Sequence, residues 1–174
     1  RQGLIALSGG RAGDIGGELL RDNIEQAEQQ ARFWQTLFPN RFYIEIQRTN
    51  RDGESLYNER AVALAEKLGL PVVATNDVRF LDAAEFDAHE ARVCIGEGRT
   101  LADPARNKSY SDEQYLRSAD EMVELFADIP SALENTVLIS QRCNVTLTLN
   151  KNYLPDFPIP NGQTIEHYLS EKSQ

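Results

Sequence analysis

The sequence predicts an α/β fold built on a parallel sheet. Three short apolar segments lie at residues 4–7, 42–46 and 71–75, and a helical pattern separates each from the next. Successive strand–helix–strand units of this kind form parallel sheets covered by helices, and their strands are apolar throughout rather than alternating. Three strands alone would leave unpaired edges, so we expect this chain to be part of a longer one.

The first unit runs from the first strand into a Ser-Gly-Gly turn at residues 8–10. From residue 18 to residue 37, apolar side chains recur at steps of three and four, which predicts a single amphipathic helix. Pro39 ends this helix, and the second strand follows at residues 42–46.

The second unit begins with a turn-rich loop at residues 50–53 and a helix across residues 56–68. Gly69 is the residue type that most often ends a helix, and the third strand follows it. Functional groups of parallel sheets gather at the carboxyl ends of the strands. In this chain those ends are residues 8–10, 47–48 and 76–79.

Only helices and irregular structure are predicted after residue 81. A helix at residues 84–95 ends in a Gly-Glu-Gly sequence, and a polar loop follows at residues 101–110. The segments 111–114 and 118–121 both have the residue pattern of a capping box, and the second opens a helix that runs to Phe126.

Pro130 suits the first turn of a further helix, which we expect to extend to about Cys143. From residue 147 the chain is predicted to be irregular, because three prolines follow in close succession: Pro155, Pro158 and Pro160. A short last helix is predicted at residues 163–172.

Composition and charge limit the classes of function. The chain has 174 residues with 18 Lys+Arg and 27 Asp+Glu, and the net charge of −9 argues against a surface that holds DNA by neutralising phosphates. It contains no apolar run of about 18 residues, so we expect a cytoplasmic protein without a membrane partner. Cys94 and Cys143 lie far apart without a CxxC pattern, so we expect two buried free thiols and no zinc site.

The most informative segment is Leu-Pro-Val-Val-Ala-Thr-Asn-Asp-Val-Arg-Phe at residues 70–80. It resembles the last metal motif of the PHP domain in the alpha subunits of bacterial DNA polymerase III, in which the strand ends with Asn-Asp-x-His. Other stretches agree with this family in order and spacing along essentially the whole chain. They are Leu7-Ser-Gly-Gly10, Phe42-Tyr-Ile-Glu45, Glu124-Leu-Phe-Ala-Asp-Ile-Pro130, Glu134-Asn-Thr136, Arg142-Cys-Asn-Val145 and Leu154-Pro-Asp-Phe-Pro158.

This resemblance implies three parts. Residues 1–98 would be the C-terminal part of a PHP domain, namely the last strands and helices of a (βα)7-type barrel. Residues 99–150 would be a small helical connector. Residues 151–174, with the Pro-rich tail, would be the truncated start of the polymerase core.

The resemblance also implies which positions would hold metal. Metal-binding PHP relatives use clusters of His, Asp, Glu and Cys side chains for phosphoester hydrolysis. At the matching positions, this chain has Gly10 in place of a Cys, and Asp77 with Arg79 in place of an Asp-x-His pair. Glycine has no ligating side chain and a guanidinium has no lone pair to offer, so we expect no metal and no catalytic residue. Arg79 would replace the metal as a fixed charge in a buried structural pair with Asp77.

Neither histidine is interpreted as catalytic. His89 lies on a predicted helix beside Asp87 and Glu90, with no second metal ligand in step, which is typical of a structural or surface residue. His167 lies in the tail of the chain.

The function implied by the resemblance is that of a non-catalytic scaffold within a DNA-directed DNA polymerase. The segment would contact the rest of the alpha subunit and dock the proofreading exonuclease subunit, with no cofactor of its own. DNA and the magnesium of nucleotidyl transfer would be bound by other parts of the parent chain. The alternative is a metal-dependent PHP phosphoesterase, acting as an exonuclease or pyrophosphatase, against which Gly10 and Arg79 argue.

Overall fold

A computed structural model describes residues 3–106, 108–151, 158–159 and 162–173. The chain forms two compact units, Arg1–Cys143 and Asn144–Gln174. The first unit holds the sheet and helices α1 to α6, and the second holds α7 (Ile165–Lys172). None of the described helices is both long and apolar enough to cross a membrane.

The sheet is parallel, and its strands lie side by side in chain order. They are β1 (Ala6–Leu7), β2 (Phe42–Gln47) and β3 (Val72–Thr75). The predicted α/β fold with a parallel sheet is therefore confirmed, although β1 is shorter than the apolar segment suggested. The described strands form an open sheet, so the predicted (βα)7-type barrel is not confirmed.

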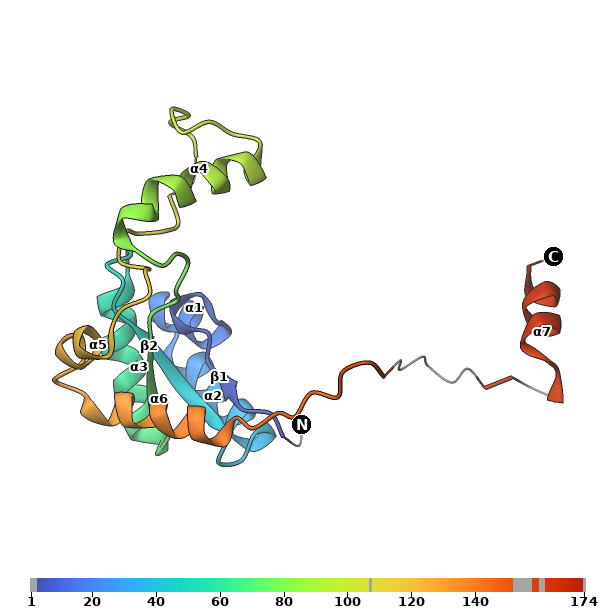
Figure 1. The fold of residues 1–174 in the computed structure, drawn as a ribbon. Helices are drawn as coiled ribbons and strands as arrows, with labels where there is room; N and C mark the ends of the chain where they lie inside the picture. The colour runs from blue at the N-terminus through green and yellow to red at the C-terminus, as the bar shows by residue number, and fades with distance from the viewer. Residues whose placement is uncertain (1–2, 107, 152–157, 160–161, 174) are drawn as a thin grey trace. The chain divides into compact units, whose positions relative to one another are not determined.

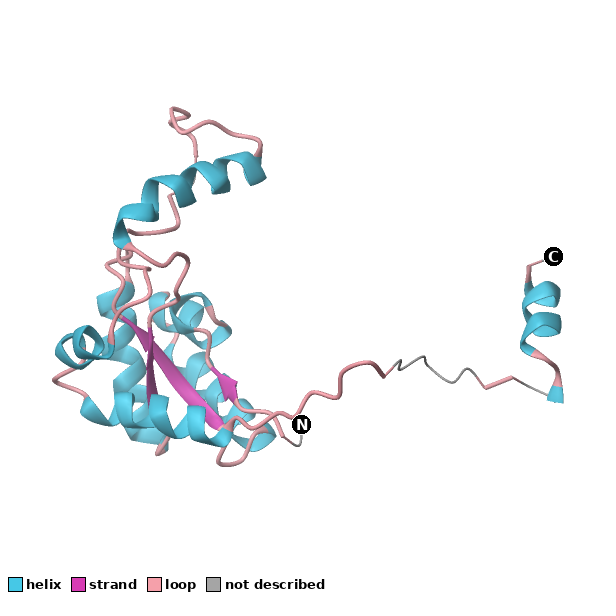
Figure 2. Cartoon of the chain, in the orientation of Figure 1, coloured by secondary structure: helices cyan, strands magenta, loops and turns pink. Residues whose placement is uncertain are grey.

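The connecting helices lie on one face of the sheet (Figures 1 and 2). α1 (Asp14–Leu20) and α2 (Ile24–Leu37) connect β1 to β2, and α3 (Glu54–Leu68) connects β2 to β3. The strands pair in chain order, and crossovers between parallel strands are right-handed. Both connections therefore place their helices on the same face of the sheet. Alternate residues of β2 belong to the core that forms beneath these helices: Phe42, Ile44 and Ile46.

The single helix predicted for residues 18–37 is wrong, because α1 and α2 are separate helices. Asp22 adopts a left-handed conformation with φ of 65°, which aspartate tolerates better than most residues. The N–H of Asn23 donates to the carbonyl of Glu18 at 2.9 Å, and the Asp22 carboxylate pairs with Arg60 of α3 at 2.8 Å. The apolar spacing continues across this turn, so periodicity alone does not reveal it.

Other predicted helix ends are confirmed. Gly69 ends α3 in a left-handed conformation with φ of 63°. Ser118 opens α5 (Ala119–Leu125): its Oγ accepts the N–H of Glu121 at 3.3 Å, and the Glu121 carboxylate accepts the N–H of Ser118 at 2.7 Å. α6 (Pro130–Arg142) begins at its proline, as expected.

α4 (Phe86–Glu97) projects from the sheet as an arm (Figure 1). It follows a 3-10 turn at Ala83–Glu85 and continues through Gly96 to end at Gly98. Cys94 is buried on this helix, as predicted. The prediction that Cys143 is also buried is wrong, because this thiol lies just beyond the last turn of α6, where it is exposed.

The second unit contains the predicted last helix. α7 is capped by Thr164, whose Oγ1 accepts the N–H of His167 at 3.3 Å. Of the three prolines in the predicted irregular tail, Pro155 and Pro160 lie outside the described residues. The family boundaries after residues 98 and 150 stay predictions, although all residues up to Cys143 belong to one compact unit.

Helix α6 covers the outer edge of β3. The side chain of Asn135 donates to the carbonyl of Val72, and the hydroxyl of Thr136 donates to the carbonyl of Ala74, both at 2.8 Å. In a parallel pair only alternate residues bond to a given neighbour, so these two carbonyls point away from β2. Two outer carbonyls of β3 therefore bond to a helix instead of another strand.

Replacing Asn135 by Ala should lower the free energy of unfolding by about 1–3 kcal/mol, because the carbonyl of Val72 loses its donor. Glu134→Ala, at the exposed neighbouring position of α6, is the control and should change stability by less than about 0.5 kcal/mol. Urea unfolding followed by circular dichroism measures both variants. Equal effects would show that the Asn135 bond does not support the strand edge.

Candidate functional site

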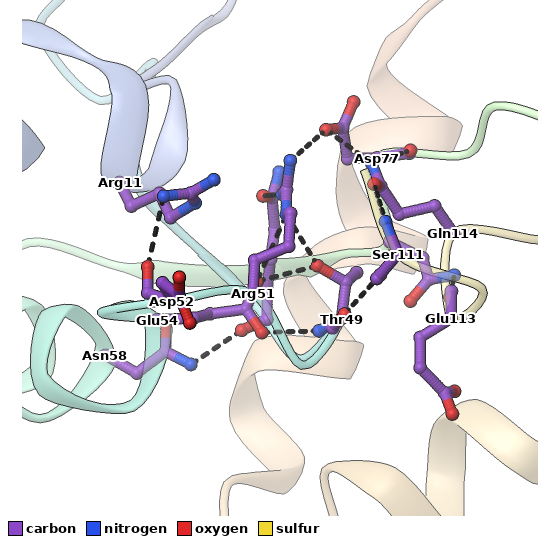
Figure 3. Close-up of polar contacts among 12 residues, drawn as sticks. Arg11, Thr49, Arg51, Asp52, Glu54, Asn58, Asp77, Ser111, Glu113 and Gln114 are labelled. Carbon is purple, nitrogen blue, oxygen red and sulfur yellow. Dashed lines mark hydrogen bonds and ion pairs between the residues drawn. The ribbon is translucent and has the colours of Figure 1, made fainter. Parts of the chain in front are cut away.

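Polar side chains from the strand ends meet at the carboxyl edge of the sheet, with Arg51 at their centre (Figure 3). Arg51 lies in the loop between β2 and α3, and its side chain is only 12% exposed. Its guanidinium donates to Gln47 Oε1 at 2.7 Å, to Thr49 Oγ1 at 2.9 Å and to Asp77 Oδ2 at 2.9 Å. One buried cation thus joins the end of β2 to the end of β3.

Asp77 has two further partners. Its Oδ1 lies 2.7 Å from Nη2 of Arg79, and its Oδ2 accepts from the amide of Gln114 at 2.9 Å. The same amide donates to the carbonyl of Asp77 at 3.0 Å, which stabilises a backbone with φ of 42°. Because the Arg79 side chain is 43% exposed, the ion pair of Asp77 with Arg79 is not the buried pair that we expected. Arg51 is the buried cation.

Gly10 lies against Gln47 at this edge. It is buried, with φ of 59°, and a Cβ added to it would lie 3.2 Å from Gln47 Oε1. The Gln47 side chain, held by Arg51, therefore occupies the space that a larger residue at position 10 would need. A side chain at this position would require Gln47 to shift slightly and would have to adopt the left-handed backbone conformation of Gly10.

The segment at residues 111–114 closes the site and does not open a helix. Half of its capping box is present, because Gln114 Oε1 accepts the N–H of Ser111 at 3.1 Å. The other half is missing, since the hydroxyl of Ser111 donates to the carbonyl of Thr49, while the Gln114 amide donates to Asp77. Thr49 in turn donates from its hydroxyl to the buried carboxylate of Glu54 at 2.7 Å. These bonds fasten a loop distant in sequence to the ends of β2 and β3 (Figure 3).

A second polar group lies between β1, β2 and α3. The hydroxyl of Tyr57 donates to the carbonyl of Glu45 at 2.6 Å, and Ser8 Oγ accepts the N–H of Glu45 at 2.9 Å. Burial raises the pKa of Tyr57 to about 12, so it stays a neutral donor. Its role is to hold β1 and β2 in place.

Among the described residues, neither histidine bonds to a side chain of the cluster around Arg51. His89 is buried on α4, with its ring 4.7 Å from the ring of Tyr110 and 5.4 Å from that of Phe80. Burial, together with the nearby charge of Arg92, lowers the pKa of His89. His167 is exposed on α7 in the second unit.

The charges at the strand edge suit an anion better than a metal ion. Among the described residues, no group of three or more His, Cys, Asp or Glu side chains could hold a metal. Arg11, Arg51 and Lys108 line a polar pocket of about 370 Å³ beside the cluster. Asp52 lines the same pocket, so the excess of positive charge there is partial. The arrangement can fix the strand ends, because Arg51 and Arg79 hold the Asp77 carboxylate between them.

Comparison with known proteins first shows the class of domain to which part of the chain is similar. Residues 1–49, which contain β1, the first two helices and β2, match the family described as "PHP domain". This is the class of domain that the motif at the end of β3 resembles.

Particular relatives extend the match along the chain. It is 56% identical over 172 residues to "DNA polymerase III subunit alpha" of Pseudomonas fluorescens, which covers 99% of this chain and 15% of the relative. It is 53% identical over 173 residues to the same subunit of Escherichia coli strain K12, and 51% identical over 174 residues to that of Haemophilus influenzae. The chain is thus related along nearly its whole length to alpha subunits of DNA polymerase III, which confirms the resemblance seen in its motifs. It spans about 15% of the length of these curated relatives.

Replacing Arg51 by Met should lower the free energy of unfolding by about 1–3 kcal/mol, because partly buried acceptors lose three hydrogen bonds from its guanidinium. Arg79→Met should cost less than about 1 kcal/mol, since Arg79 is largely in solvent and Asp77 keeps Arg51. Urea unfolding of both variants measures the difference. A larger loss for Arg79→Met would show that Arg79, and not Arg51, holds the strand ends together.

Proposed function

We propose that the chain is a non-catalytic scaffold segment of a replicative DNA polymerase III alpha subunit, and that it docks the proofreading exonuclease subunit. The parent protein would carry out DNA-templated DNA synthesis in the cytoplasm. Its DNA and the magnesium ions of nucleotidyl transfer would be bound by other parts of the polypeptide. This segment would contact the remainder of the alpha subunit.

The proposal of a non-catalytic role rests on the buried guanidinium of Arg51. It lies among Gln47, Thr49 and Asp77, at the strand edge where functional groups of parallel sheets gather. A metal ion placed beside it would meet fixed positive charge instead of free carboxylates. Gly10 contributes no side chain. This edge of the sheet is therefore better suited to stabilising the fold than to hydrolysing a phosphoester.

The proposal of docking is supported by the surface of the α4 arm. Three large apolar side chains, one on α4 and two in the segments before and after it, are more than half exposed: Ile95, Leu81 and Leu101. Exposed large apolar side chains are typical of surfaces that bind another protein when they form a contiguous patch. The arm would therefore present the face to which the exonuclease subunit binds.

A photoreactive residue at position 95 of the full-length alpha subunit should crosslink to the exonuclease subunit. The same residue at Phe33, an exposed apolar position of α2 away from the arm, is the matched control and should crosslink much less. Mass spectrometry of the crosslinked products identifies the partner. Absence of crosslinks from position 95 while the two subunits still copurify would place the docking surface elsewhere.

The alternative is a metal-dependent PHP phosphoesterase, which the match of residues 1–49 to the PHP family favours. A phosphoesterase would require tightly bound transition-metal ions whose binding depends on Asp77, whereas a non-catalytic scaffold would bind no ion at this position. The metal content of the full-length protein and of its Asp77→Asn variant is measured by mass spectrometry. We expect equal metal content in both proteins, and a loss of ions from the variant would favour the phosphoesterase.

A further inference from the structure

A small pocket lies between the end of β3 and α4, apart from the cluster around Arg51. Its volume is about 300 Å³, which is at the lower end of the range for small-molecule sites. Three basic side chains line it, Arg79, His89 and Arg92, together with Phe80, Leu81, Ala88 and Glu85. Arg79 is the one residue through which the pocket touches the strand-edge site, by its ion pair with Asp77.

The cations of this pocket are incompletely neutralised. The guanidinium of Arg92 makes no hydrogen bond or ion pair with any side chain in the described part of the chain. Arg79 has one nitrogen on Asp77, and its guanidinium carbon lies 5.4 Å from the centre of the Tyr110 ring. The one acidic residue at the pocket, Glu85, already accepts the N–H groups of Leu81 and Asp82 at 2.9 and 3.2 Å.

His89 adds a buried polar group without a partner. Its side chain is 5% exposed, and Nδ1 has no hydrogen-bond partner among the described residues. The nearest carboxylate oxygen belongs to Glu90, at 3.9 Å, and Glu90 is itself bonded to Arg106. The His89 ring forms part of the pocket wall, but because Nδ1 has almost no exposed surface, this nitrogen does not face the pocket.

We propose that this pocket binds the phosphate group of a small ligand. Arg79 and Arg92 would donate to its oxygens, because a guanidinium donates to oxyanions in fixed, often bidentate geometry. The ring of His89 would contribute to the wall of the pocket. Phe80, Leu81 and Ala88 provide an apolar wall for the part of the ligand beyond the phosphate.

The surroundings favour a single oxyanion over a nucleic-acid strand. The exposed carboxylates of Asp82 and Asp87 lie close in sequence to the pocket, and the whole chain carries a net charge of −9. A strand with a phosphate at every nucleotide would be repelled by these groups, whereas one phosphate between two arginines would not. The proposal does not depend on whether the exonuclease subunit docks on this segment.

Titration calorimetry of the full-length protein with inorganic phosphate, at constant ionic strength, tests the site. Arg92→Gln should weaken the affinity of the pocket about tenfold or more, because a charge-assisted hydrogen bond is lost. Arg92 is exposed, so this variant should fold normally, which circular dichroism verifies. Arg32→Gln, at an exposed arginine of α2, is the matched control and should bind phosphate as the unmodified protein does.

A parallel titration with a deoxynucleoside monophosphate separates the two sources of phosphate. Tighter binding of the nucleotide, again lost in Arg92→Gln, would identify a nucleotide phosphate as the ligand, whereas equal affinity would identify free phosphate. The proposal is overturned if neither ligand binds, or if Arg92→Gln binds both as tightly as the unmodified protein does.

Discussion

The partly buried ion pair of Arg51 with Asp77 is the constraint on which the carboxyl edge of the sheet depends. Strands β2 and β3 pair through their backbones, and side chains of the loops beyond them join the two strand ends. A single guanidinium bonds to Gln47, Thr49 and Asp77 at once. Since Gln114 also bonds to Asp77, the loop that returns from the α4 arm is fixed by the same group.

Much of the fold could be predicted from the sequence, because buried strands and amphipathic helices leave clear patterns. The strands at residues 42–46 and 71–75 and the ends of α3, α5 and α6 follow from apolar runs, glycine, serine and proline. The division between α1 and α2 could not be predicted, because Asp22 reverses the chain without interrupting the apolar spacing. Residues 111–114 have the capping-box pattern without opening a helix for a similar reason. The hydroxyl of Ser111 bonds to a carbonyl that is distant in sequence.

The candidate site was predicted less completely than the fold. The positions of Gly10, Asp77 and Arg79 followed from motifs, yet the buried cation is Arg51, which belongs to a loop that reads only as a turn. Its role depends on the packing of two strand ends, and no local pattern carries that information. The one available signal was its place directly after the carboxyl end of β2. The pocket beside His89 likewise depends on residues that meet only after folding.

The bonds from Asn135 and Thr136 to β3 decide at which edge the sheet could accept another strand. A further strand could join beside β1, where no described helix bonds to the backbone edge, but pairing beside β3 would first require α6 to leave. If a longer polypeptide extends this sheet into a ring, the ring would have a seam at β3 that a helix closes. At such a seam the first and last strands do not pair with each other, so no register between them is required. They could therefore differ in length while the ring still closes.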